Sequence, residues 1–189
     1  HQSDNTLILF LSDNGGNAES GVKGKYIGDL PGDPHSDVFV GQCWAHLNNT
    51  PFRKYKHFNH EGGIASPLIA HWPAKVHPRS ARNQWINTPT HLIDIMATCV
   101  DLAGATYPTE FKGQAIVPMQ GQSLRPLWEG QGEFRQRPLF WEHEGNAAIR
   151  VGHRKLVRDG LKGPWELFDL KSDRTEQLDL SEKFPQEVI

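Results

Sequence analysis

The stretch that decides the fold is Leu7-Ile8-Leu9-Phe10-Leu11-Ser12-Asp13-Asn14-Gly15-Gly16. Its apolar part has the length of one strand and stops abruptly at residues that favour turns. A continuous apolar run bounded in this way is typical of a strand buried on both faces, as in a parallel sheet. We therefore predict a strand over residues 6–12 and a fold of the α/β class.

Asp13 and Asn14 place a carboxylate and an amide oxygen side by side directly after this strand. In open α/β sheets ligands bind at the carboxyl ends of strands, and hard oxygen donors suit calcium or magnesium. Gly15 and Gly16 let the backbone turn sharply away. A simple Asx turn that closes the strand explains the same residues. Calcium takes about six to eight oxygens, so two ligands require partners from elsewhere.

A second polar stretch contains Lys56 and, five positions later, Glu61-Gly62-Gly63. A lysine ammonium is a compact point charge that suits an oxyanion. Taken alone, Lys56 also fits a solvated surface lysine among Arg53 and Lys54, and Glu61 could equally be an exposed acid in a turn. The residues by themselves leave both interpretations open.

Histidines are frequent near these segments, but their spacing does not indicate a zinc hydrolase. No pair shows the helical spacing with an acid between that such enzymes use. A nucleophile elbow and a phosphate-binding Walker loop are also missing from the sequence. The histidines concerned are His57, His60, His71, His91 and His143.

The composition of the chain excludes several classes of protein function. The 189 residues carry a net charge of -2, which gives no reason to expect nucleic acid as a partner. No apolar run approaches the ~18 residues of a membrane span. Cys43 and Cys99 are too few for a disulfide scaffold, and the sequence does not show whether they pair. Residues 1–5 are polar and read as a loop feeding a strand, so we expect a fragment of a longer protein.

The remaining elements follow from periodicity and turn residues. We predict a strand over 67–72, a helix over 88–102 with Thr88 as its cap, and a short helix over 123–129. Residues 15–37 and 104–122 are predicted loops. Four short strands, over 139–142, 147–151, 155–158 and 165–169, indicate a small antiparallel sheet, and a helix is expected to start within 181–189. We expect residues 1–130 to belong to an incomplete main α/β domain and residues 131–189 to form a small C-terminal subdomain.

Together these segments resemble the second half of the type I sulfatases, which belong to the alkaline-phosphatase-like superfamily. Members of that family look like a strand followed by S-D-N-G-G, and then K-x-x-x-x-E-G-G-x-x-x-P. Here Lys56 precedes Glu61 at the family spacing, and Pro67 follows in place. Other segments that match in order are Trp72-Pro73, Asp94 with Thr98, Leu102-Ala103-Gly104, Gly121-Gln122-Ser123-Leu124, residues 141–146 and residues 166–170.

The resemblance implies a site. Asp13 and Asn14 would be calcium ligands, Lys56 would contact the sulfate, and His143 would face the substrate cleft. The nucleophile of the family is a formylglycine made from the Cys or Ser of a C/S-x-P-x-R motif, and neither Cys43 nor Cys99 lies in that context. The resemblance therefore places the nucleophile, and an early pair of aspartates that completes the calcium site, upstream of this chain.

The function implied is hydrolysis of sulfate esters, either aryl sulfates or sulfated glycans, by an intact enzyme that also has an N-terminal half and is periplasmic or secreted. The fragment alone is expected to be inactive. Two alternatives stay open at this point. One is a phosphoesterase or phosphonate hydrolase of the same superfamily, and the other is a non-catalytic carbohydrate-binding module that uses the aromatic C-terminal sheet.

Overall fold

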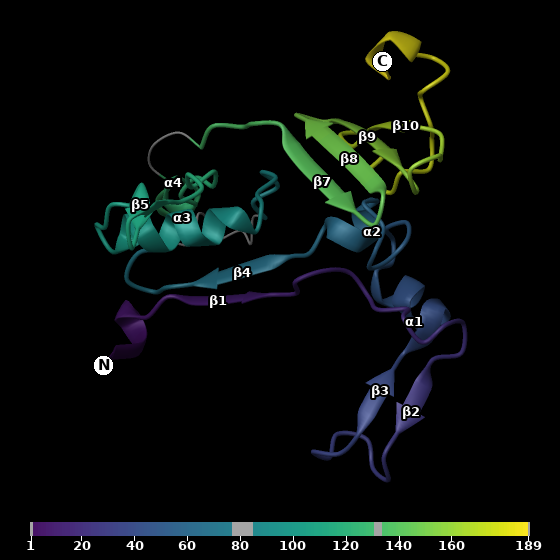
Figure 1. The fold of residues 1–189 in the computed structure, drawn as a ribbon, viewed down its shortest axis with the longest axis horizontal. Coiled ribbons are helices and arrows are strands. Elements are labelled where there is room, and N and C mark those ends of the chain that lie inside the picture. Colours follow the sequence, from purple (N-terminus) through teal and green to yellow (C-terminus); the bar gives the residue numbers. More distant parts are fainter. Residues whose placement is uncertain (1, 77–84, 131–133, 189) are drawn as a thin grey trace. The chain divides into compact units, whose positions relative to one another are not determined.

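The computed structural model describes residues 2–76, 85–130 and 134–188, and it is an α/β protein with small sheets (Figure 1). The chain divides into two compact units. Unit 1 contains residues 1–10 and 68–136, and unit 2 contains residues 11–67 and 137–189. Among the described residues no helix is long and apolar enough to cross a membrane.

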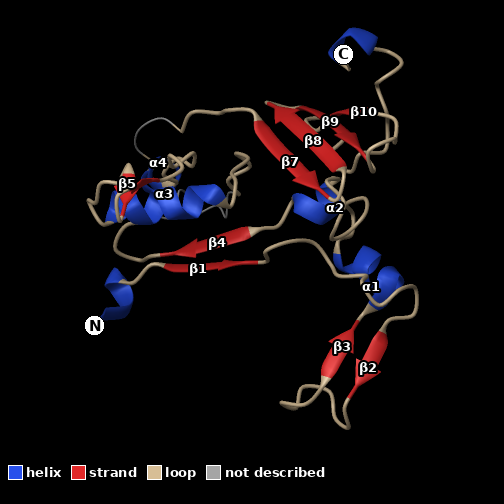
Figure 2. Ribbon diagram, in the orientation of Figure 1, coloured by secondary structure: helices blue, strands red, loops and turns tan. Residues whose placement is uncertain are grey.

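Unit 1 holds the predicted first strand. After a short 3₁₀ turn, η1 (Gln2–Asn5), β1 (Ile8–Leu11) pairs with β4 (Leu68–His71) in a two-stranded sheet (Figure 2). The two predicted strands are confirmed, but the expected burial on both faces is wrong. Ile8 is 53% exposed and Phe10 is 70% exposed, so the face of β1 that carries them is open to solvent among the described residues.

The main helix of unit 1 is α3 (Ile93–Leu102), which starts five residues later than predicted. The Asp94 carboxylate organises its start, since it accepts hydrogen bonds from the backbone N–H groups of His91 and Gln122. One turn later, the Thr98 hydroxyl accepts the N–H of Leu124. These contacts fasten residues 121–124 to α3, so two of the segments that match sulfatases serve to build this unit.

Smaller elements complete unit 1. A two-stranded hairpin, β5 (Glu110–Phe111) with β6 (Gln114–Ala115), lies inside the predicted loop 104–122. The short helix α4 (Arg125–Glu129) confirms the prediction for that segment and ends at Gly130, which has a φ of 69°. Trp128 of α4 and Leu124 are buried, and they form the apolar centre of the unit together with Ala97.

Unit 2 contains the predicted antiparallel sheet, with strand order β10-β9-β8-β7. Its strands are β7 (Leu139–His143), β8 (Asn146–Val151), β9 (Arg154–Arg158) and β10 (Glu166–Asp169). Buried residues from the sheet, including Ala148, Val157 and Phe168, pack against Trp141 and form the core. Glu144 and Gly145 join β7 to β8, and both have positive φ, as a two-residue hairpin turn requires.

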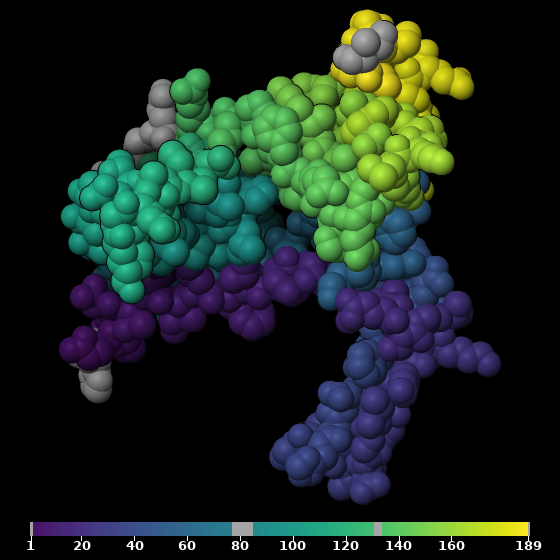
Figure 3. Space-filling view, in the orientation of Figure 1, coloured from purple at the N-terminus to yellow at the C-terminus, as the bar shows by residue number. Residues whose placement is uncertain are grey.

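The N-terminal part of unit 2 holds elements that the sequence analysis assigned to loop or left unassigned. A hairpin of β2 (Lys25–Ile27) and β3 (Asp37–Phe39) is followed by α1 (Gly41–Asn48), and a single helical turn, α2 (Glu61–Ile64), follows Lys56. Figure 3 shows the hairpin as the dark blue-purple projection, and its side chains are largely exposed. The expected helix at the C-terminus is reduced to a 3₁₀ turn, η2 (Pro185–Glu187).

Candidate active site

The two glycine pairs of the sequence meet at one junction in unit 2. The N–H of Gly15 donates to the carbonyl of Gly63 at 3.0 Å, and a Cβ built on Gly15 would collide with the carbonyl oxygen of Gly62. The N–H of Lys56 donates to the carbonyl of Gly16, also at 3.0 Å. The chain bends over residues 13–15, as predicted for a turn here, but neither Gly15 nor Gly16 has a positive φ, and the junction needs both glycines for close backbone approach.

The junction brings the segment of Asp13 and Asn14 against the segment of Lys56. Asp13 is exposed and Asn14 is half-buried, and neither side chain makes a hydrogen bond or ion pair with a described residue. Their oxygens are therefore free to receive a ligand. A carboxylate and an amide oxygen that no protein donor occupies fit a hard cation such as calcium. The hydrogen bond with Glu19 is the main reason that the pKa of Lys56 is raised, and the Asp13 carboxylate adds a smaller electrostatic contribution in the same direction.

Lys56 is 31% exposed and forms an ion pair with Glu19. The hydrogen bond with Glu19 raises the pKa of the Lys56 ammonium, burial lowers it, and the net direction is upward. In return, the hydrogen bond with Lys56 holds the pKa of the Glu19 carboxyl below its ordinary value. The lysine is thus cationic and partly accessible, and its partner in this structure is the exposed carboxylate of Glu19.

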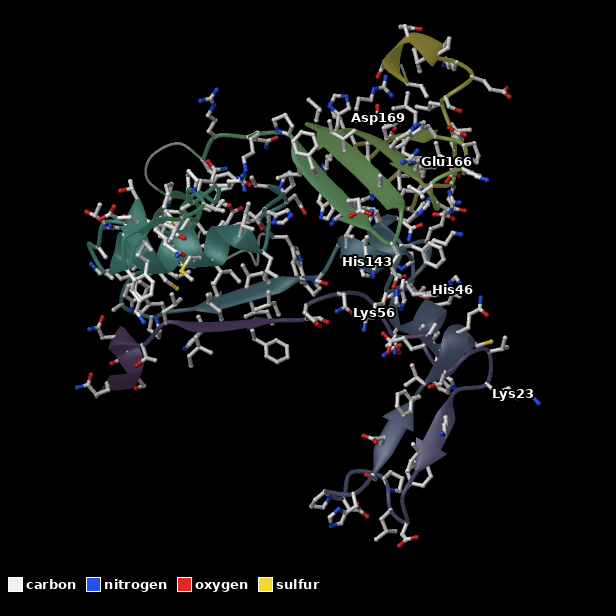
Figure 4. All side chains as sticks on the ribbon, in the orientation of Figure 1. Lys23, His46, Lys56, His143, Glu166 and Asp169 are labelled. Carbon is white, nitrogen blue, oxygen red and sulfur yellow. The ribbon has the colours of Figure 1, made fainter. Side chains whose placement is uncertain are left out.

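His143 ends β7, and Figure 4 shows it near Lys56. Its Nε2 atom is 3.3 Å from Nδ1 of His57, and the two rings stack with centroids 5.4 Å apart. His57 Nδ1 is also 2.9 Å from a carboxylate oxygen of Glu144. The structure therefore brings His143 into the neighbourhood of Lys56, although 86 positions separate His143 from His57 along the chain.

Glu61 of the Glu-Gly-Gly motif is buried, which makes its interpretation as an exposed acid wrong. It is 3% exposed, and one of its carboxylate oxygens lies 2.9 Å from the ammonium of Lys155 on β9. Glu176 holds the same ammonium at 2.8 Å and accepts the N–H of Glu61 at 2.8 Å. Lys155 and Glu176 are both fully buried. This ion network of Glu61, Lys155 and Glu176 attaches the C-terminal sheet to the segment that carries Lys56.

A second group of contacts also joins the segment around Lys56 to the C-terminal sheet. His60 is fully buried and lies 2.8 Å from the carboxylate of Glu166 on β10, which also binds Arg53 at 3.1 Å. Lys54, which the sequence suggested to be solvated, donates to Asp159 at 2.8 Å and lies over the ring of Phe58. The lysines on either side of Tyr55 therefore differ in their contacts, since Lys54 binds Asp159 and Phe58, whereas Lys56 pairs with the exposed Glu19.

The sequence analysis named neither Glu19, which pairs with Lys56, nor Glu144, which contacts His57, and it left His57 unassigned. His57 was visible only as the neighbour of Lys56, and Glu144 only as the neighbour of His143. No local signal indicates that Glu19 meets Lys56, because the contact depends on a fold-back of the chain between them. Cys43 and Cys99, whose pairing was left open, are free thiols.

Comparisons with known proteins agree on one family. The family model described as Sulfatase matches residues 1–105. An uncharacterized sulfatase of Schizosaccharomyces pombe is 28% identical over 96% of this chain and 35% of its own length. Human steryl-sulfatase is 32% identical over 79% of this chain and 21% of its own length. The chain thus spans about a third, or less, of the curated relatives that it matches.

Solved structures give the same result. The crystal structure of Ps i-CgsB aligns over 99% of this chain and 35% of its own, with a TM-score of 0.68 and 26% identity. The same protein has been solved in complex with k-i-k-neocarrahexaose. A phosphonate monoester hydrolase of Agrobacterium radiobacter, at 20% identity and a TM-score of 0.56 over 97% of this chain and 33% of its own, shares the fold. Because the family model covers more than half of the chain, this chain belongs to the sulfatase family.

Proposed function

We propose that this chain is the C-terminal part of an enzyme that hydrolyses sulfate esters, and that it supplies one wall of the active site. The observation that carries the proposal is the main-chain junction between Gly16 and Lys56. It fixes a pair of free oxygen donors, on Asp13 and Asn14, beside a cationic and accessible lysine. A cation site next to an anion contact is what a sulfate group requires.

The roles of the residues follow from this arrangement. Asp13 and Asn14 hold calcium together with ligands from the preceding part of the protein. When bound, calcium supplies positive charge that stabilises the sulfate oxygens. Lys56 contacts the same oxygens once it leaves Glu19, and His143 faces the substrate. In a water-excluded site the lysine contact strengthens, since a charge pair at 4 Å is worth ~1 kcal/mol in water and ~4 kcal/mol at an effective dielectric constant near 20.

The nucleophile belongs to another part of the enzyme. The C/S-x-P-x-R motif that yields formylglycine does not occur in this sequence, and the residues after Cys43 and Cys99 do not resemble it. The chain by itself is therefore expected to hydrolyse no sulfate ester. The resemblance to sulfatases also supports a periplasmic or secreted location for the intact enzyme.

A glycan is the favoured substrate. Support comes from the oligosaccharide complex of Ps i-CgsB, a structure that this chain matches over nearly its full length. The match to the Sulfatase family model favours ester hydrolysis over the alternative of a carbohydrate-binding module. Similarity to the phosphonate monoester hydrolase concerns the fold, so it does not favour phosphonates over sulfates.

The test uses the full-length protein that contains this chain. Initial rates would be compared for a chromogenic aryl sulfate, a sulfated oligosaccharide and a chromogenic phosphonate monoester. We expect both sulfates to be turned over, the phosphonate to be much slower, and activity to fall when calcium is chelated. Calorimetry should show weaker calcium binding in Asp13→Ala. Faster turnover of the phosphonate, or calcium binding that Asp13→Ala leaves unchanged, would contradict the proposal.

A further inference from the structure

Three side chains on the surface of unit 2 form a compact triangle next to Lys56. Their ligand-type atoms are Nδ1 of His57, Nε2 of His143 and a carboxylate oxygen of Glu144. The three separations are 2.9 Å for His57–Glu144, 3.3 Å for His57–His143 and 3.9 Å for His143–Glu144. Among the described residues this is the one group of three or more His, Cys, Asp or Glu side chains with such close ligand atoms.

These separations are close to those between neighbouring ligand atoms of one metal ion. Zinc binds imidazole nitrogen at about 2.0–2.1 Å in tetrahedral geometry, which places neighbouring ligand atoms about 3.3–3.4 Å apart. The measured separations of 2.9, 3.3 and 3.9 Å lie on either side of that value. We propose that His57, His143 and Glu144 bind a divalent transition metal of the zinc class, with a fourth position open to water or to a ligand.

The surroundings of His57 support a built site. Its other ring nitrogen, Nε2, lies 3.5 Å from the carboxylate of Glu19. Histidines that bind metals commonly face a carboxylate through their second nitrogen, because this orients the ring and raises its basicity. Glu19 is thus placed behind the ring, on the side away from the triangle.

The backbone holds His57 in position independently of its side chain. His57 has a φ of 83°, a conformation that residues other than glycine rarely adopt. The buried side chain of Asn146 donates to the His57 carbonyl at 2.9 Å, and its oxygen accepts the N–H of Gly160 at 2.8 Å. Strained residues fixed in this way concentrate at functional sites. The same Asn146 begins β8, so it couples His57 to the hairpin that carries His143 and Glu144.

The chemistry of the donors separates this site from the calcium site. Two imidazoles and one carboxylate suit zinc, cobalt or nickel, whereas carboxylate and amide oxygens suit calcium. His143, His57 and Glu144 are 52%, 31% and 63% exposed on their side chains, so a metal ion can reach them from solvent. The site is therefore a second metal centre, distinct in ligand type from Asp13 and Asn14.

The experiment titrates the full-length protein, purified without a histidine tag, with CoCl₂ and then with ZnCl₂. Binding is read from the visible absorption of Co²⁺, whose intensity reports low coordination number, and from competition by Zn²⁺. This readout does not depend on enzyme activity, so it stands apart from the test of sulfate hydrolysis. We expect one Co²⁺ per chain at the site, displaced by Zn²⁺ but not by calcium at the same concentration.

Single-residue variants test which side chains bind the Co²⁺ ion. His57→Asn removes the imidazole and keeps a residue that tolerates a positive φ. Glu144→Gln keeps the shape of an exposed turn residue, which protects the test if His57→Asn fails to fold. Each should weaken Co²⁺ binding by at least about tenfold, the lower end of the effect of losing a supporting group. His153→Gln, which removes an exposed histidine from the next turn of the same sheet, is the control and should bind normally. Unchanged affinity in Glu144→Gln, or an equal loss in His153→Gln, would overturn the proposal.

Discussion

Neutralising Lys155 is expected to destabilise unit 2 strongly. Its ammonium lies 2.9 Å from Glu61 and 2.8 Å from Glu176, and all three side chains are at most 3% exposed. Lys155→Met keeps most of the volume but leaves two carboxylates buried without their cation. Removing one partner of a buried ion pair costs about 3–5 kcal/mol. For a chain of this size that corresponds to a fall in melting temperature of about 6–20 °C.

Urea unfolding followed by tryptophan fluorescence measures this cost. The control is Lys171→Met, at an exposed lysine just after β10, which should change the unfolding free energy by less than about 0.5 kcal/mol. The triple variant Lys155→Met, Glu61→Gln and Glu176→Gln removes all three charges and should recover part of the loss, since no uncompensated charge remains buried. A cost below about 1 kcal/mol for Lys155→Met would refute the argument that this network attaches the sheet.

Three further outcomes are expected. Lys56→Ala should lower kcat/KM for a sulfate ester by about a hundredfold, because a preorganised charge contact at reacting oxygens contributes ~3 kcal/mol, while the exposed control Lys23→Ala should be neutral. Gly15→Ala should destabilise the protein by about 1–3 kcal/mol in the same urea assay, because its methyl group collides with the backbone carbonyl of Gly62 and a main-chain atom cannot move aside. The Glu19 carboxyl should titrate below the ordinary glutamate pKa in carboxyl NMR, and its pKa should return toward that value in Lys56→Ala. Because the folded-state pKa is lowered, the stabilisation that the Lys56–Glu19 pair contributes is fully present above the ordinary pKa and is lost as pH falls through the lowered pKa.

Much of the fold could be predicted because it follows from local patterns. The strand before Asp13, the four short strands of the C-terminal sheet and the helix ending at Leu102 all have clear apolar runs and turn residues. The predicted start of α3 was wrong, because the helix begins at Ile93 with Leu92 as its N-cap residue, and the Asp94 carboxylate binds the N–H of His91 just before it. The α1 helix and the β2–β3 hairpin were missed because their short segments lack a strong period.

Site residues could be predicted from the sequence only where their spacing matched that of the sulfatase family. Asp13, Asn14, Lys56 and His143 are therefore named from sequence, and their roles stay predictions. The partners of these residues depend on contacts across the chain that no local pattern encodes. Glu61 shows the limit most clearly, since its motif was visible while its burial against Lys155 was not.

The hydrogen bond between Lys56 and Gly16 also has a consequence for how this protein can vary. The main-chain hydrogen bond between Lys56 and Gly16 holds together the two ends of residues 17–55, so this segment is a closed loop. The entropy of closing such a loop grows only slowly with its length. Insertions and deletions at the tip of the β2–β3 hairpin can therefore lengthen or shorten this segment without moving the charged residues near its two ends. For protein engineering, that tip is the place to graft a new recognition element.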